Sequence, residues 1–164
     1  MPLKIGDRLP DATFRTPAPE GPLTLSTADV FAGKKVVLFA VPAAFSPTCS
    51  QVHLPGYVRN YEAIKASGID IIACLSTNDA WVLGAWAEQN DAVGKVLMLS
   101  DGNLEFTRAA GMELDARVVG EGFRSQRYAA IVDDGVVVDI RIEEKPWLAE
   151  ASSAGAICGL NAQK

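Results

Sequence analysis

Short apolar runs recur along the chain, separated by polar segments that contain glycine, proline, asparagine or aspartate. Three of these runs are rich in valine, isoleucine and leucine and predict strands, at 36–40, 69–76 and 95–101. The first two lack polar alternation, which is typical of strands buried on both faces of a sheet. A helical pattern follows each strand, at about 47–66, from 80 onward and at 103–112.

Hairpin patterns lie at both ends of the chain. The proline- and glycine-rich N-terminus has two short arms, 12–16 and 22–26. Near the C-terminus, the segment 127–143 predicts two strands joined by Asp133-Asp134-Gly135, before a weak helical pattern at 149–161. Strands that alternate with helices and then form a hairpin predict one α/β domain, residues 1–164, with a mixed central sheet.

Two helices carry more detailed expectations. Pro55 lies inside the first helix, so we expect a kink or bulge near His53. Asn78 and Asp79 are good capping residues for the second helix. There Trp81, Val82, Ala85 and Trp86 are assigned to one face, which predicts that both tryptophans pack against the sheet.

Charge and hydropathy argue against several classes of partner. The chain of 164 residues has a formal net charge of −5 and no cluster of basic residues, which disfavours nucleic acid and anionic membranes. The longest apolar run, 36–45, is too short to span a bilayer and contains Pro42. The N-terminus has no apolar core of the signal-peptide type, so we expect a cytoplasmic protein; a transit peptide removed from this sequence is the alternative.

Three cysteines, Cys49, Cys74 and Cys158, allow at most one internal disulfide. The chain has no Cys-x-x-Cys pattern and one histidine, so we expect neither a structural zinc site nor a thioredoxin-type dithiol. In a reducing compartment the cysteines should rest as thiols, and any disulfide would be a transient step of the chemistry.

Cys49 is the strongest candidate for chemistry. Ser46 is a favoured N-cap and Pro47 a favoured first helical residue, so Cys49 becomes the third residue of a helix that follows a buried strand. Unpaired backbone N–H groups and the positive end of the helix dipole favour a thiolate at that position. The alternative is a small buried apolar residue, which is the commoner role of a free cysteine.

The pattern Pro42-x-x-x-Ser46-x-x-Cys49 resembles the active-site motif of the peroxiredoxins, in which threonine usually stands at the position of Ser46. Its continuation through His53, Pro55 and Gly56 resembles the type II, peroxiredoxin-5-like branch. The segments 78–86 and 124–135 are also similar to type II sequences. The resemblance implies a thioredoxin-like α/β sandwich and a thiol peroxidase that needs no metal, flavin or nucleotide.

The resemblance also assigns roles to residues. Cys49 would be the peroxidatic nucleophile, and Arg127, with Arg124 as its local competitor, would contact both thiolate and peroxide. The Ser46 hydroxyl would bond the sulfur or the peroxide, and Pro42 would shield the pocket. Thr48 and His53 belong to the pocket.

The same resemblance implies a reaction cycle. Cys49 would become a sulfenic acid on reaction with hydrogen peroxide or an alkyl hydroperoxide, and a second thiol would then form a disulfide. Cys74 and Cys158 are both open candidates for that thiol, as is an external one. A direct Cys49–Cys74 bond needs Cα atoms within about 7 Å, and therefore local unfolding. Glutaredoxin with glutathione, or thioredoxin, would restore the thiol, and type II members are often homodimers.

Three alternatives remain on the sequence alone. The protein could be a redox sensor whose Cys49 oxidation switches an interaction, or a thioredoxin-like module with an inert Cys49. A hydrolase with a Cys49–His53 pair is the third; it is disfavoured because a side chain one turn further along is poorly placed to meet the sulfur.

Overall fold

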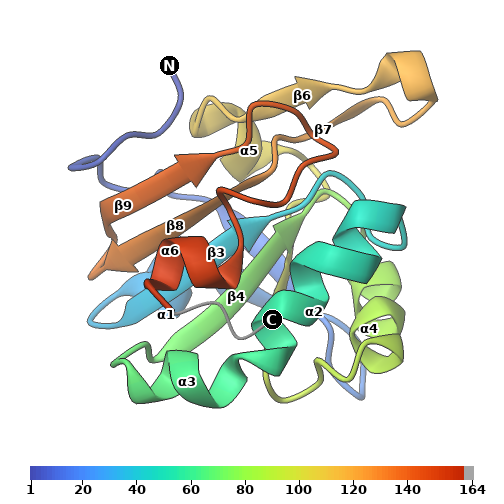
Figure 1. The fold of residues 1–164 in the computed structure, drawn as a ribbon. Coiled ribbons are helices and arrows are strands. Elements are labelled where there is room, and N and C mark those ends of the chain that lie inside the picture. Colours follow the sequence, from blue (N-terminus) through green and yellow to red (C-terminus); the bar gives the residue numbers. More distant parts are fainter. Residues whose placement is uncertain (161–164) are drawn as a thin grey trace.

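The computed structural model describes residues 1–160, and a seven-stranded sheet forms its centre (Figure 1). The strands are β1 (Thr13–Thr16), β2 (Leu23–Ser26), β3 (Lys35–Ala40), β4 (Ile71–Ser76), β5 (Leu97–Ser100), β8 (Tyr128–Asp133) and β9 (Val136–Ile142). Their order is β2-β1-β5-β4-β3-β8-β9. β3 is parallel to β4, and β4 to β5, while β1–β5, β3–β8 and both terminal hairpins are antiparallel. The predicted mixed sheet and α/β fold are confirmed.

Helices cover both faces of this sheet. They are α1 (Thr27–Phe31), the π-helix η1 (Cys49–His53), α2 (Leu54–Arg59), α3 (Tyr61–Ala66), α4 (Ala80–Gln89), α5 (Glu105–Ala109) and α6 (Ala154–Cys158). One apolar cluster joins the sheet to η1, α2, α3, α4 and α6, and a second joins the opposite face to α1, α5 and the N-terminal segment. A small second sheet pairs β6 (Glu113–Asp115) with β7 (Phe123–Ser125), and the 3-10 helix η2 (Arg117–Val119) lies between them in the chain.

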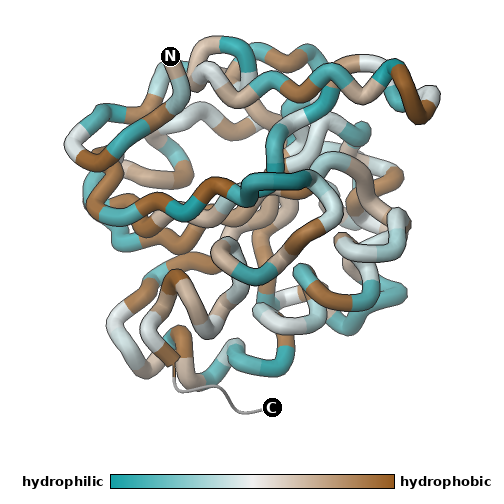
Figure 2. Tube along the Cα trace, turned by 45° about the horizontal axis from the view of Figure 1, so that its top comes forward, coloured by the Kyte–Doolittle hydropathy of each residue, from teal (hydrophilic) through white to brown (hydrophobic). Residues whose placement is uncertain are grey.

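The central strand β3 is buried on both sides, as its apolar run predicts. Val37 and Phe39 belong to one cluster, while Val36, Leu38 and Ala40 belong to the other, and all are fully buried. Figure 2 shows hydrophobic segments running through the interior strands, with hydrophilic residues concentrated in loops and at the periphery. This strand leads directly into the segment that carries Cys49.

The expectation that both tryptophans of α4 pack against the sheet is wrong for Trp81. Trp86 is fully buried, and its Nε1–H donates to Ser50 Oγ at 2.9 Å, whereas Trp81 is 73% exposed. Residues five apart on an α-helix lie about 140° from each other, so the two rings cannot share a face. The buried face of α4 is instead formed by Ala80, Leu83, Trp86 and Ala87.

Several local expectations are confirmed and others are corrected. A π-helix ending at His53 provides the predicted bulge, and the helix ends at Ala66 after a break at Asn60. Asp79 caps α4 by accepting from Val82 N–H. Asn78 does not cap α4; its Oδ1 accepts from the Ala44 N–H and from the Ser76 hydroxyl.

The C-terminal hairpin is confirmed, and Asp134 and Gly135 adopt positive φ at its turn, as a two-residue hairpin loop requires. The closing helix predicted at 149–161 is shorter, because α6 covers only Ala154–Cys158 and ends at Gly159, whose φ is +63°. Residue 161 of that prediction lies outside the described residues.

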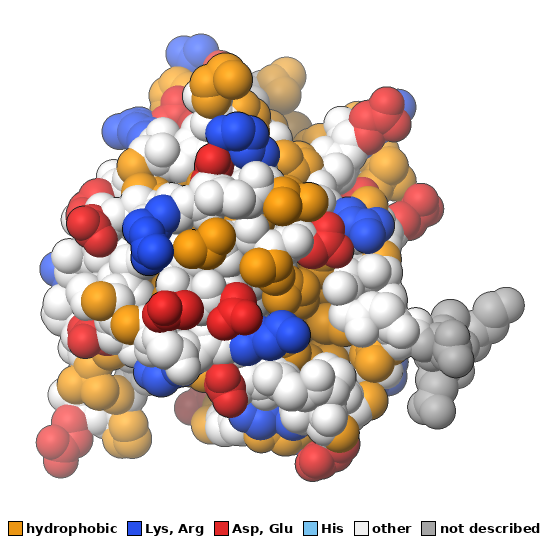
Figure 3. Space-filling view, turned by 90° about the vertical axis from the view of Figure 1, so that its left-hand side faces the viewer, with side chains coloured by type: hydrophobic (Ala, Val, Ile, Leu, Met, Phe, Trp, Pro, Cys, Tyr) orange, Lys and Arg blue, Asp and Glu red, His pale blue; other side chains and the backbone are white. Residues whose placement is uncertain are grey.

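The surface carries charges of both signs. Figure 3 shows lysine, arginine, aspartate and glutamate side chains interspersed on the side of the molecule that lies to the left in Figure 1. Within residues 1–160, no helix combines the length and the apolar character that crossing a membrane requires.

Candidate active site

The segment after β3 is tied to the end of β4 and to the loop that follows it. Val41 N–H donates to the Leu75 carbonyl at 3.0 Å, and Ala44 N–H donates to Asn78 Oδ1 at 2.9 Å. Helical structure then begins at Pro47, as the sequence predicts. The predicted cap is not observed: the Ser46 hydroxyl donates to the Ala43 carbonyl at 2.7 Å, and no helix N–H among the described residues donates to it. Its role toward the sulfur or a peroxide stays a prediction.

The helical turn that begins at Cys49 is a π-turn. Leu54 N–H donates to the Cys49 carbonyl, five residues earlier, where an α-helix would use the carbonyl four residues earlier. Pro55 follows and has no N–H to continue an α-helical ladder. The wider turn buries the side chains of Cys49 and His53 at 0% and 2% exposure.

Arg127, which directly precedes β8, is only 3% exposed and is held by three hydrogen bonds. Its Nε donates to the Pro146 carbonyl at 2.8 Å, one terminal nitrogen donates to His53 Nδ1 at 2.9 Å, and the other donates to Cys49 Sγ at 2.9 Å. A guanidinium keeps its charge at any working pH, so burying it requires compensation. The Cys49 sulfur lies 2.9 Å away and, as a thiolate, would supply the opposite charge.

His53 orients this arginine as a neutral ring. Its Nε2–H donates to the Ser152 carbonyl at 3.0 Å, which leaves the Nδ1 lone pair free to accept from Arg127. Burial, with the positive charge of Arg127 as the second cause, lowers the pKa of His53 to about 3. The ring therefore stays uncharged at neutral pH. Since His53 bonds Arg127 rather than Cys49, the geometry does not form the Cys–His pair of a hydrolase.

The remaining motif residues surround the turn. Thr48 Oγ1 donates to the Trp147 carbonyl at 3.0 Å, which ties the start of the helix to the segment after β9. Pro42 is buried two residues after the end of β3. Arg124, the competitor of Arg127, lies in β7, where its Nε donates to the Glu121 carbonyl at 2.8 Å. The structure therefore brings Arg127 to the sulfur and engages Arg124 elsewhere.

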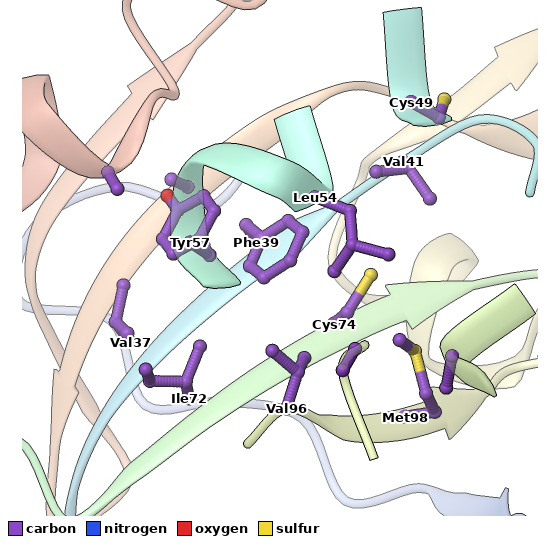
Figure 4. Close-up of a cluster of buried hydrophobic side chains, with 14 of the residues drawn as sticks. Val37, Phe39, Val41, Cys49, Leu54, Tyr57, Ile72, Cys74, Val96 and Met98 are labelled. Atoms are coloured by element: carbon purple, nitrogen blue, oxygen red, sulfur yellow. The ribbon is translucent and has the colours of Figure 1, made fainter. Parts of the chain in front are cut away.

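The two other cysteines are separate from the Cys49 sulfur. Cys74 is fully buried on β4, and in Figure 4 its sulfur points toward Leu54, while Cys49 lies apart beside Val41. Burial raises the pKa of Cys74 well above its usual range, and burial also raises the pKa of Cys158, on α6, to about 11. None of the three cysteines forms a disulfide in this structure.

Sequence reasoning missed several residues that complete the site. The Ser152 carbonyl accepts from both His53 and the Tyr57 hydroxyl, and the Glu143 carboxylate in turn accepts from Ser152. A signal for Tyr57 existed in its spacing four residues after His53 on one helix. Ser152 carried none, because its contact depends on how the segment after β9 folds back.

The single histidine gives a prediction about stability. An unfolded histidine has a pKa of 6.5, whereas folded His53 has one of about 3, so between these values the unfolded state binds more protons. Lowering the pH from 7.5 to 5 should therefore reduce the free energy of unfolding by about 2 kcal/mol through His53. Urea unfolding at both pH values measures this.

The matched variant for that measurement is His53→Gln, which removes the titrating ring while carboxylates contribute equally to both proteins. The difference in pH dependence between wild type and variant isolates His53. An identical pH dependence in the two proteins would show that His53 is not held neutral.

The fold and site together define a class of protein. A thioredoxin-like sheet carries a buried cysteine at a helix start, with a buried arginine donating to its sulfur. Within residues 1–160, no group of three or more histidine, cysteine, aspartate or glutamate side chains is arranged to hold a metal ion. The arrangement is suited to thiol-based redox chemistry.

Comparisons with known proteins agree with this class. A family model described as Redoxin matches residues 4–157. The chain is 51% identical over 149 residues to peroxiredoxin-2E-2, chloroplastic, from Oryza sativa subsp. japonica, and 48% identical over 146 residues to peroxiredoxin-2E, chloroplastic, from Arabidopsis thaliana. Each match covers 87% of this chain but only 65% and 62% of those relatives, which is less than two thirds of their length.

Among solved structures, reduced Prx3 in complex with hydrogen peroxide, from Vibrio vulnificus, superimposes with a TM-score of 0.90 at 46% identity. That match covers 96% of this chain and 98% of the other. The chain therefore belongs to the peroxiredoxins, in the type II branch of the thioredoxin-fold superfamily.

Proposed function

We propose that this protein is a thiol-dependent peroxidase that reduces hydrogen peroxide and alkyl hydroperoxides through Cys49. The observation that carries the proposal is the buried Arg127 guanidinium, which donates to Cys49 Sγ at 2.9 Å. This contact stabilises a thiolate nucleophile and leaves a cation beside the point where the peroxide bond breaks. The peroxiredoxin relatives support the same activity.

The proposed reaction balances without a cofactor. The Cys49 thiolate attacks one oxygen of the hydroperoxide, so that an S–O bond forms while the O–O bond breaks. The other oxygen leaves with its electron pair, takes a proton and departs as water or alcohol. Sulfur is oxidised to a sulfenic acid and the peroxide is reduced. Arg127 offsets the negative charge that grows on the leaving oxygen.

The burial of Cys49 and the exposed apolar side chains near it support the proposed substrate class. Cys49 has no exposed surface, so a peroxide reaches it only when the surrounding segment moves. Phe45, four residues before Cys49, has a φ of +67° and is 47% exposed. Trp147 is 64% exposed, and its carbonyl accepts from Thr48, the residue before Cys49. Both offer apolar surface to an alkyl hydroperoxide, while the Vibrio vulnificus relative binds hydrogen peroxide.

An external thiol is the proposed partner for the sulfenic acid. Cys74 is enclosed beneath the helical turn and Cys158 is on α6, and the raised pKa of each thiol leaves little nucleophilic thiolate at neutral pH. Glutathione with glutaredoxin, or thioredoxin, would form a mixed disulfide with Cys49, release water, and restore the thiol with a second thiol equivalent.

Rapid mixing of the reduced protein with one equivalent of hydrogen peroxide tests two points together. It measures the reaction of Cys49 with peroxide, and it shows whether a second thiol of the protein reacts with the sulfenic acid. Tryptophan fluorescence gives the rate, and titration of remaining thiols gives the number lost. We expect fast loss of one thiol, unchanged in the Cys74→Ser and Cys158→Ser variants, and turnover only when an external thiol is added.

Other outcomes would point elsewhere. Loss of two thiols that requires Cys74 or Cys158 would show an internal resolving cysteine. Fast oxidation with poor turnover by any of these reductants would favour a redox sensor. A reaction no faster than that of free cysteine would contradict the peroxidase and leave a thioredoxin-like module with an inert Cys49.

Assembly and location are further parts of the proposal. We expect a homodimer with contacts near the active-site loops, since exposed apolar side chains there include Phe45 and Trp147; sedimentation at micromolar concentration tests it. A cytoplasmic location stays a prediction, and the rice and Arabidopsis relatives are named as chloroplastic. Fractionation of cells that express the full-length protein would decide between these compartments.

A further inference from the structure

A segment after β9 crosses the site and supplies much of its hydrogen bonding. We call residues 143–152 the strap; in Figure 1 it is the red loop between β9 and α6. Backbone carbonyls of the strap accept from four side chains of the site: Pro146 from Arg127 at 2.8 Å, Trp147 from Thr48 at 3.0 Å, and Ser152 from His53 at 3.0 Å and Tyr57 at 2.7 Å. The conformation of the strap thus sets where these side chains point.

One buried carboxylate joins the two ends of the strap. Glu143 is 9% exposed, and its Oε1 accepts from the Ser152 backbone N–H at 2.8 Å and from the Ser152 hydroxyl at 2.9 Å. Ser152 itself is fully buried. A carboxylate that accepts two hydrogen bonds in the interior is a strong, directional anchor.

Glu143 is also the neighbour of Arg127 across the β8–β9 ladder. Tyr128 pairs with Ile142, and the next backbone bond runs from Glu143 N–H to the Arg127 carbonyl at 2.9 Å. Side chains directly opposite in an antiparallel pair project from the same face. Arg127 and Glu143 nevertheless bond other groups, because Ser152 engages the carboxylate and the guanidinium is turned toward His53 and Cys49.

We propose that Glu143 is a positioning residue for the reaction of Cys49: it holds Ser152, Ser152 holds His53, and His53 holds Arg127 on the sulfur. The proposal rests on the peroxidase function above. The central link is the ring of His53. The Ser152 carbonyl accepts from Nε2–H, which favours the tautomer and the ring orientation in which Nδ1 accepts from Arg127.

A direct electrostatic effect of Glu143 would act with the opposite sign. The titratable groups packed around Cys49 are Arg127 before β8, His53 and Tyr57 on the helical segment, Cys74 on β4 and Glu143 at the base of the strap. Removing a nearby negative charge would by itself favour the thiolate. Removing an anchor that keeps Arg127 in place would disfavour it, so the direction of the change separates the two roles.

The test compares Glu143→Ala with Glu143→Gln, and uses Glu144→Ala as the matched control on the exposed neighbouring carboxylate. Two quantities are measured: the rate constant with hydrogen peroxide and the fraction of thiolate at pH 7 from its ultraviolet absorbance. The absorbance of a Cys49→Ser protein is subtracted.

We expect Glu143→Ala to lower the rate constant about 10- to 100-fold and to reduce the thiolate fraction, since a displaced Arg127 loses the sulfur. Glutamine keeps an oxygen that can accept from Ser152, so Glu143→Gln should stay within about fivefold of wild type. Glu144→Ala should match wild type. Equal effects of alanine and glutamine, or a higher thiolate fraction in both variants, would overturn the positioning role.

A second variant covers the case in which Glu143→Ala does not fold. Ser152→Ala keeps the backbone N–H bond to Glu143 and loses only the hydroxyl bond, so it should lower the rate about 3- to 10-fold. An unchanged rate in Ser152→Ala, with Glu143→Ala unfolded, would overturn the proposal.

Alkylation of Cys49 by iodoacetamide separates this proposal from the proposed function. It reports thiolate reactivity without peroxide. If wild type fails to reduce peroxide but alkylation slows in Glu143→Ala and not in Glu143→Gln, the peroxidase fails and the positioning role stands. If wild type reduces peroxide and neither variant alters alkylation, the positioning role alone fails.

Discussion

Replacing Cys49 with serine is expected to lower the rate of hydrogen peroxide reduction by about 10³-fold or more, to the level of the uncatalysed reaction. A serine hydroxyl keeps nearly the same volume but is not ionised beside Arg127, and it cannot accept the peroxide oxygen as sulfur does. The fold should survive, because Cys49 is one small residue of a large apolar cluster. Peroxide consumption with excess thiol reductant measures the effect.

Two matched cysteine variants serve as controls for this result. Cys74→Ser and Cys158→Ser remove thiols that do not contact Arg127, and each should keep the rate constant for the first step. Loss of the first step in Cys74→Ser, with Cys49→Ser still active, would reassign the nucleophile.

Replacing Arg127 with lysine is expected to lower the rate constant with peroxide about 10²-fold. Lysine keeps the positive charge but has one nitrogen in place of the planar fork that bonds Pro146, His53 and Cys49 together. A lysine nitrogen that reaches the sulfur leaves the His53 Nδ1 and the Pro146 carbonyl without their donor. Stopped-flow fluorescence, with circular dichroism to verify folding, measures the loss.

Arg124→Lys is the matched control for the lysine substitution. Arg124 lies three residues earlier and its Nε donates to the Glu121 carbonyl, away from the sulfur. Its replacement should leave the rate within about twofold of wild type, as for most surface changes. An equal loss in both variants would mean that positive charge in this region, and not the Arg127 geometry, controls the reaction.

Much of the fold could be predicted from local pattern. The strand that precedes Cys49, the terminal hairpins and the alternation of strands with helices all follow from apolar runs and turn residues. The error on Trp81 shows the limit of such reasoning. The prediction assigned both tryptophans to one helix face, while the 100° step of the helix and the packing of Trp86 place Trp81 outside.

The site was predictable only in part. The motif singled out Cys49, the family resemblance assigned Arg127 beside it, and proline inside the helix predicted the bulge near His53. The hydrogen bonds of Ser46 and Asn78 differ from the expected caps, because Ser46 donates to the Ala43 carbonyl and Asn78 accepts from Ala44 and Ser76. Such competition between partners is decided by loop geometry, which residue types do not encode individually.

The sequence by itself determined the central strand, the helix start that presents Cys49, and the family. These depend on residues close in the chain, where apolar pattern and proline act directly. Only the tertiary structure decided that Arg127, 78 residues from Cys49, reaches its sulfur, and that Ser152, 99 residues from His53, orients the ring. The physical reason is that strand register and the path of the strap bring these groups together. A buried charge or carbonyl forms its hydrogen bonds with the groups that the fold places beside it.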